Sequence, residues 1–154
     1  MMSSRQEARI VSLLLCVGHR EPMRVVESAN LIAGSGIEGD RHAVSEGVRS
    51  ARQVLLMDEE TLQAMSLSYG DVRENITTSG IDLYDLTEGQ RLALGDEVVV
   101  EITGHCAPCA RMDEVRPGLK DKLEGRRGML SFVVKGGAIQ VGDAIHVLER
   151  ATAS

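Results

Sequence analysis

Aromatic residues are nearly absent from this chain of 154 residues, which contains one Phe, two Tyr and no Trp. Its hydrophobic core must therefore be built from aliphatic side chains. The length is that of one domain and is large enough to bury a core without disulfide staples. We expect a single domain over residues 8–150, with flexible termini at 1–7 and 151–154.

Basic stripes and long apolar runs are also missing. The formal net charge is −6, which argues against a general affinity for nucleic acid phosphates, because such affinity needs clustered Lys and Arg. No segment approaches the roughly 20 apolar residues of a membrane span. Partners of either kind, nucleic acid or membrane, are not expected.

Cysteines are few and odd in number: Cys16, Cys106 and Cys109. A secreted disulfide framework is a poor interpretation of this set, and a reducing cytoplasm fits it better. The apolar run that ends at Cys16 is too short for a signal-peptide core, and the bulky Leu15 precedes the cysteine where a lipoprotein signal needs a small residue. Cys16 itself is expected to be an inert core residue.

Short β-branched or alternating segments bounded by Gly or Asp recur along the chain and predict strands. One helix is expected after Asp58, a plausible N-cap followed by two acidic residues, and a brief one over Gly118 to Leu123. Three glycines within 34–39 argue against a regular element there. The pattern predicts a mainly β fold: a closed or nearly closed β-barrel of about seven or more short strands with one or two short helices. Expected strands are Arg9–Val17, Gln53–Met57, Asn75–Thr78, Leu92–Leu94, Val98–Thr103, Met129–Lys135 and Ala144–Leu148, with a short extended pair within Met23–Leu31.

The segment from Gly104 to Asp113 leaves an apolar strand and places a Pro-Cys pair just beyond it. Cys106 and Cys109 have the C-x-x-C spacing of a redox disulfide or half a zinc site. The surrounding sequence lacks the βαβ pattern that accompanies a redox disulfide of this kind. It also lacks a second ligand pair that would complete a zinc site. A single reactive or metal-ligating thiolate at Cys109 needs less, since nearby Arg or His charge would lower its pKa. An inert loop cysteine is the alternative.

Two other polar clusters precede strands or turns. Arg73 can clamp a phosphate, and Asn75 offers donor and acceptor edges to a pterin or amide ligand. The same string also suits a solvated surface. Asp40, Arg41 and His42 follow Gly39 in a loop whose backbone N–H groups suit an anion. An Asp-capped turn explains that loop equally well.

In their order along the chain, these clusters resemble the MOSC family, named for the C-terminal domain of molybdenum cofactor sulfurase. The motifs are a Gly-Ile-x-Gly-Asp loop, an Arg-x-Asn segment, a Gly-Asp turn leading to a Pro-Cys loop, and Gly-Gly-x-Ile-x-Val-Gly-Asp. They lie here at Gly36–Asp40, Arg73–Asn75, Gly95–Cys109 and Gly136–Asp143. The resemblance covers Ile10 to Leu148.

The resemblance implies a β-barrel and a cysteine, Cys109, that either ligates molybdenum in a bound molybdopterin cofactor or carries sulfane sulfur. It implies that Arg73 and Asn75 help hold the phosphate and pterin, as in the mitochondrial amidoxime-reducing relatives. Those relatives have Arg before the cysteine where this chain has Pro108, so the charge around the thiolate is open. They also have a separate N-terminal barrel domain, in place of which a homo-oligomer or a smaller site would serve.

Two functions follow from the resemblance. In the first, the cofactor reduces N-hydroxylated compounds and an electron-donor reductase is the partner. In the second, Cys109 accepts sulfur from a cysteine desulfurase and passes it on for metal-sulfur or cofactor assembly. No Schiff-base lysine for pyridoxal phosphate is evident, so the sulfur would come from another protein. The role of Cys106 is open, as is a third function in which the protein only stores the cofactor.

Overall fold

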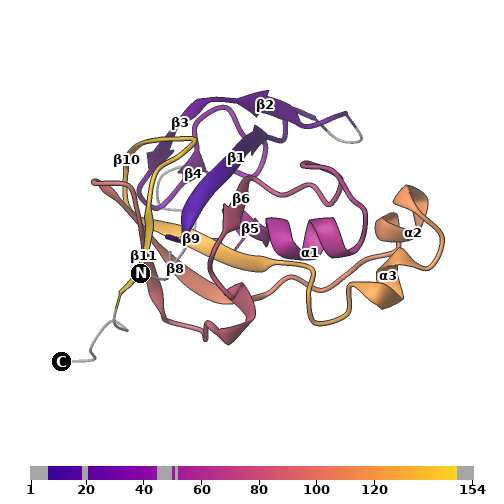
Figure 1. Ribbon diagram of the computed structural model, residues 1–154. Helices are drawn as coiled ribbons and strands as arrows, with labels where there is room; N and C mark the ends of the chain where they lie inside the picture. The colour runs from indigo at the N-terminus through magenta and orange to yellow at the C-terminus, as the bar shows by residue number, and fades with distance from the viewer. Residues whose placement is uncertain (1–6, 19–20, 45–49, 51, 149–154) are drawn as a thin grey trace.

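The computed structural model describes residues 7–18, 21–44, 50 and 52–148. The polypeptide forms eleven short strands, three short α-helices and one 3-10 turn in the described ranges (Figure 1). The elements are β1 (Arg9–Leu15), β2 (Arg24–Val26), β3 (Ser28–Ile32), β4 (Gly36–Ile37), β5 (Val54–Asp58), α1 (Glu59–Ala64), β6 (Ile76–Ser79), η1 (Leu83–Asp85), β7 (Arg91–Leu94), β8 (Val98–His105), α2 (Arg111–Val115), α3 (Leu119–Lys122), β9 (Met129–Lys135), β10 (Gly137–Gln140) and β11 (Ile145–Leu148).

Most strands belong to one eight-stranded sheet in the order β11-β7-β8-β9-β5-β6-β1-β2. A three-stranded sheet, β10-β3-β4, accompanies it. Every ladder is antiparallel except the one between β5 and β6, where Leu56 is opposite Ile76. Parallel neighbours need a crossover, and here α1 and the loop after it form that connection.

The prediction of a mainly β fold with few short helices is confirmed, but no continuous ladder closes a barrel among the described strands. β1 meets the start of β11 through an isolated bridge between Arg9 and Ala144, with backbone hydrogen bonds on both sides of it, and no further ladder forms between them in the described residues. β1 instead pairs with β6 and β2, with a register shift between Ile10 and Ser12. β-Bulges of this kind bend a strand and interrupt its pairing.

An aliphatic core fills the space between the sheets, as the scarcity of aromatic residues requires. In β8 and β9 the burial alternates along the strand, so that one face of each packs inward. A second, smaller cluster lies under the helices, which gather on one side of the molecule, to the right in Figure 1. Its buried members are Met57, Leu62, Val72, Met112, Leu119 and Leu123.

The start of α1 follows the sequence prediction. Asp58 accepts hydrogen bonds from the backbone N–H of Thr61 at 3.1 Å and from its hydroxyl at 2.7 Å. Glu59 and Glu60 occupy the first turn, where the helix dipole favours negative charge. The helix ends at Ala64. Ser66 has a φ of 56°, a left-handed conformation that no helix continues through.

Four elements were not expected, and one of them is the 3-10 turn η1. β4 forms at Gly36–Ile37 because the glycine-rich loop turns back onto β3, so the prediction of no regular element there was wrong. β10 was not among the predicted strands, and α2 follows Cys109 without a hydrogen-bonding side chain at its N-cap. The flexible termini predicted at 1–7 and 151–154 lie outside the described residues, Glu7 excepted.

Gly128 joins the helical side of the molecule to β9 in a space that admits no side chain. Its φ is 104°, and a Cβ there would lie 2.4 Å from the carbonyl oxygen of Leu56. We expect Gly128→Ala to lower the free energy of unfolding by about 2–5 kcal/mol, through both backbone strain and overpacking. Urea unfolding followed by circular dichroism measures this change.

The matched control is Gly142→Ala. Gly142 has a similar φ of 98° and open space around the added methyl group. Only the backbone strain applies there, about 1–2 kcal/mol. Equal losses for the two variants would show that the close approach of Gly128 to β5 does not constrain the fold.

Candidate functional site

Asp40 is a buried carboxylate at the centre of the glycine-rich loop, 6% exposed. Its Oδ1 accepts a hydrogen bond from the backbone N–H of Cys16 at 2.7 Å. Its Oδ2 accepts one from the backbone N–H of His42 at 2.9 Å and lies 3.3 Å from the His42 imidazole. The Asp-capped turn is therefore present. Burial acts to raise the pKa of Asp40, but the His42 side chain and the backbone donors together hold it below its ordinary value.

Asn75 connects three segments through its side chain. Its Oδ1 accepts a hydrogen bond from the N–H of Leu55 in β5 at 3.0 Å, and its Nδ2 donates to the carbonyl of Leu14 in β1 at 3.2 Å. Nδ2 also donates to Asp40 Oδ1 at 2.9 Å. Only an amide offers an acceptor and two donors from one short side chain. Both amide hydrogens of Asn75 are thus used within the protein.

Arg73 lies beside the same cluster. Its backbone φ is 66°, and its Nη2 donates to the carbonyl of Gly18 at 3.0 Å. Nη2 also contacts the Sγ of the buried Cys16 at 3.1 Å, and Nη1 donates to the carbonyl of Glu21. The guanidinium therefore rests against the end of β1 and the chain that follows. We refer to Asp40, His42, Arg73 and Asn75, gathered around Cys16, as the polar hub.

The segment that contains Cys109 is anchored at both ends. At one end the N–H of Cys106 donates to the carbonyl of Gly128 at 3.0 Å. At the other, the carbonyl of Cys109 accepts from the N–H of Met112, whose side chain is buried in the second core cluster. Cys109 is exposed, whereas Cys106 is 5% exposed. A defined loop thus presents the Cys109 thiol to solvent.

We expected the charges near Cys109 to come from Arg111, His105 and Arg73. Arg111 begins α2 two residues after Cys109, whereas the other two are engaged elsewhere. Arg73 belongs to the polar hub, and His105 stacks on Tyr84 with ring centroids 5.9 Å apart. Arg41 is exposed, and its backbone N–H donates to Cys16. The structure therefore brings four predicted residues together in the hub and holds Cys109 on a separate loop. The roles of all of them toward a cofactor stay predictions.

Sequence reasoning missed two buried charged residues, Glu74 and Arg127. Glu74 lies between Arg73 and Asn75 in the chain and is fully buried. Burial raises the pKa of its carboxyl, against the lowering effect of several hydrogen bonds and of the Arg127 charge. Arg127 precedes Gly128 and is 6% exposed. The only sequence signal was the pair Arg126-Arg127 before a strand, and two adjacent arginines are typical of an exposed segment.

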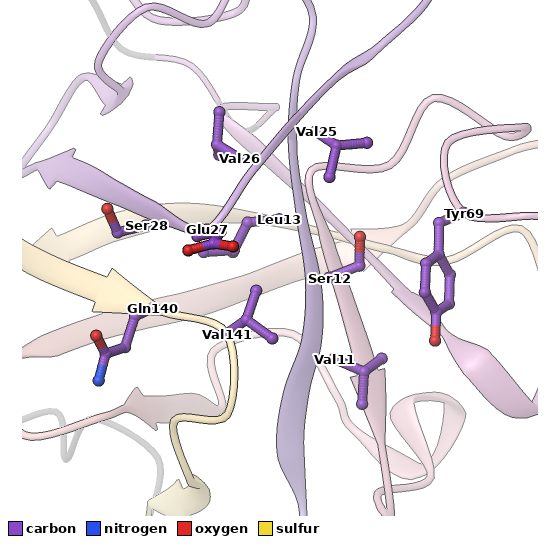
Figure 2. A pocket seen from close by; sticks show the side chains of 10 residues that line it. All are labelled: Val11, Ser12, Leu13, Val25, Val26, Glu27, Ser28, Tyr69, Gln140 and Val141. Carbon is purple, nitrogen blue, oxygen red and sulfur yellow. The ribbon is translucent and has the colours of Figure 1, made fainter.

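A surface groove of about 580 Å³ lies along β1 and β2. Figure 2 shows valine side chains of β1, β2 and the β10–β11 turn around it, with Tyr69 at one end. None of the predicted site residues lines this groove. Among the residues that the structure covers, no helix is both long enough and apolar enough to cross a membrane.

The hub carboxylate makes stability depend on pH in a defined direction. Because the folded-state pKa of Asp40 is depressed, its contribution is present above its ordinary value of 3.8 and is lost as pH falls through the folded value. In Asp40→Asn the new amide NH₂ group would face the N–H donors that now bind the carboxylate. We therefore expect the free energy of unfolding to fall by about 1–3 kcal/mol at pH 6. Urea unfolding at several pH values should show that loss shrinking below about pH 4.

Asp96→Asn is the control, since Asp96 is exposed in the turn before β8. It should change the free energy of unfolding by less than about 0.5 kcal/mol. A pH-independent loss in Asp40→Asn would contradict the assignment of an ionised carboxylate to the hub.

Comparison with known proteins places this geometry in a family. None of the curated proteins matches the chain. The structure is similar to that of the YuaD protein from Bacillus subtilis, with a TM-score of 0.80 and 22% identity over 97% of this chain and 100% of that one. It is also similar to YiiM from Geobacillus stearothermophilus, with a TM-score of 0.74 and 17% identity over 95% and 77% of the two chains. YiiM from Escherichia coli gives a TM-score of 0.68 and 16% identity over 94% and 71%. The family model for the MOSC domain matches residues 41–146, and the chain therefore belongs to the MOSC domain family.

Proposed function

We propose that this protein binds a molybdenum cofactor through the thiolate of Cys109 and reduces N-hydroxylated compounds. The observation that supports this most is the exposure of the three thiols. Cys16 and Cys106 are buried, and Cys109 alone among the cysteines is exposed. A soft thiolate is a ligand that suits molybdenum. An exposed thiol is also accessible to an incoming cofactor.

The residues present fit such a cofactor in their chemistry. The loop of Cys109 is fixed by the backbone contact of Cys106 and the burial of Met112, so the thiol is presented from a rigid support. Arg127 offers buried donors without partners on the neighbouring segment. When bound, the cofactor would supply two-electron chemistry, while the protein orients it and controls its surroundings.

The protein's own contribution is positioning. The polar hub holds the Arg73–Asn75 segment against β1 and β5, and the middle residue of that segment, Glu74, is buried. An electron-donor protein must approach from outside, and the exposed side of the Cys109 loop is open to it. The hub donors that sequence analysis assigned to a pterin are bonded within the chain, so we assign them to support of the site.

Replacing Cys109 should separate ligation from folding. In protein produced in a host that makes the cofactor, Cys109→Ser should contain at least about tenfold less molybdenum than wild type, because the serine oxygen is a harder and weaker ligand than the thiolate. Inductively coupled plasma mass spectrometry measures the metal. Cys106→Ser is the control and should keep its molybdenum, and equal metal in wild type and Cys109→Ser would overturn the ligand assignment.

A sulfur-carrier function is the second candidate, and the same exposure favours it. The Cys109 thiolate would attack the outer sulfur of a cysteine desulfurase persulfide, forming a Cys109 persulfide and releasing the desulfurase thiolate. Such a reaction between two proteins needs an accessible thiol. Buried cysteines do not meet that condition.

Mass spectrometry distinguishes this candidate. After incubation with a cysteine desulfurase and free cysteine, wild-type protein should gain the mass of one sulfur atom, reversible by a thiol reductant. Cys109→Ala should gain nothing, and Cys106→Ala should behave like wild type. A wild-type protein that gains no sulfur would exclude the carrier function and leave the cofactor function to the metal assay.

A further inference from the structure

Arg127 is a buried cation, and two of its three donor nitrogens have no hydrogen-bond partner. Its side chain is 6% exposed, and neither Nε nor Nη1 has a hydrogen-bond partner. Burying a guanidinium without hydrogen bonds is costly, because water is removed and nothing replaces it. A ligand that accepts hydrogen bonds would remove that cost.

Backbone contacts fix where this cation lies. The carbonyl of the next residue, Gly128, accepts the N–H of Cys106 at 3.0 Å. Gly128 itself approaches β5 so closely that no Cβ fits. Arg127 is therefore held beside the loop that ends at Cys109.

Arg127 also acts on the Arg73–Asn75 segment. Its charge acts on the buried carboxyl of Glu74, although no ion pair between the two is among those described. One Glu74 oxygen accepts from the N–H of Gly70 at 3.0 Å and from the hydroxyl of Thr77 at 3.1 Å. The other oxygen has no partner. Arg127 thus lies between the two segments that the MOSC motifs single out.

Neighbouring arginines are already engaged. Arg73 donates to the carbonyls of Gly18 and Glu21. Arg116 donates to the carbonyls of Met65 and Ser66. Arg126 donates to the Thr61 hydroxyl, lies 4.8 Å from the Tyr84 ring centre and is 3.8 Å from Asp58. Arg127 differs from all three in being buried with unpaired donors.

We propose that Arg127 is the residue that holds the phosphate group of the bound cofactor, in place of Arg73. This inference rests on the proposed function. A guanidinium binds a phosphate oxyanion by charge-assisted hydrogen bonds, and it does so most strongly where water is excluded. Burial raises the pKa of Glu74, while the charge of Arg127 acts to lower it.

Two measurements on the intact chain test the assignment. Isothermal titration calorimetry with inorganic phosphate at low ionic strength measures anion binding by the purified apoprotein. Fluorescence of the oxidised pterin released from protein made in a cofactor-competent host measures loading. In Arg127→Met, we expect phosphate affinity and pterin content each to fall by at least about tenfold. Arg126→Met removes the same charge one position earlier and should match wild type in both.

The outcomes separate this assignment from the proposed function. Wild-type protein without pterin would contradict the proposed function. The phosphate titration would then still show whether Arg127 binds an anion. Wild-type protein that contains pterin while Arg127→Met retains it equally would overturn the assignment and leave cofactor binding intact. No binding of phosphate by wild type, or unchanged binding in Arg127→Met, would also overturn it.

Folding of the variant is checked by circular dichroism. If Arg127→Met does not fold, Arg127→Lys keeps the charge and replaces the planar fork of donors by a single ammonium. Its phosphate affinity and pterin content should both fall several-fold. Wild-type values in a folded Arg127→Lys would overturn the assignment, because only the charge would then matter.

Discussion

The hydrogen bond between Asp40 and Asn75 is the contact on which the arrangement of the site depends. It joins the glycine-rich loop to the start of β6, while the same Asn75 amide binds the backbones of β1 and β5. A buried polar network is stabilising only when each member is satisfied. Here a carboxylate and an amide satisfy each other and four backbone groups, including the N–H groups of Cys16 and His42.

The hub explains why the functional segments keep their relative places. β5 and β6 run in parallel, so no tight turn joins them, and the connection passes through α1 and the loop that contains Arg73. Asn75 fastens the end of that loop to β5. Glu74, immediately before it, is buried, and the charge of Arg127 acts on its carboxyl. The loop of Cys109 joins the same region through Gly128.

Local sequence signals predicted much of the fold because their causes are local. Asp58 caps α1, and the alternating burial of β8 and β9 follows from their apolar periodicity. Closure of the sheet is set by long-range pairing, and neither that pairing nor the register shift between β1 and β6 has a counterpart in composition. β10 begins at the second of two consecutive glycines and pairs with β3, which is distant from it in the sequence.

The site was predictable in its members more than in their contacts. Asp40, Arg73 and Asn75 were recognised as polar residues in the order of the family motifs. A sequence cannot show that the Asn75 amide forms its hydrogen bonds with the backbones of β1 and β5. Cys16 was correctly placed in the core, yet its contact with Arg73 depends on residues 57 apart. Arg127 looked like a surface residue because its burial results from the fold as a whole.

The central claim of this account is that Cys109 is the protein ligand of a cofactor-borne metal. X-ray absorption at the molybdenum edge tests it most directly, on protein produced in a cofactor-competent host. The account predicts that Cys109→Ser has one sulfur neighbour fewer per molybdenum in the metal that it retains, and that Cys106→Ser has the wild-type number. An unchanged sulfur coordination in Cys109→Ser, or its loss in Cys106→Ser, would contradict the claim.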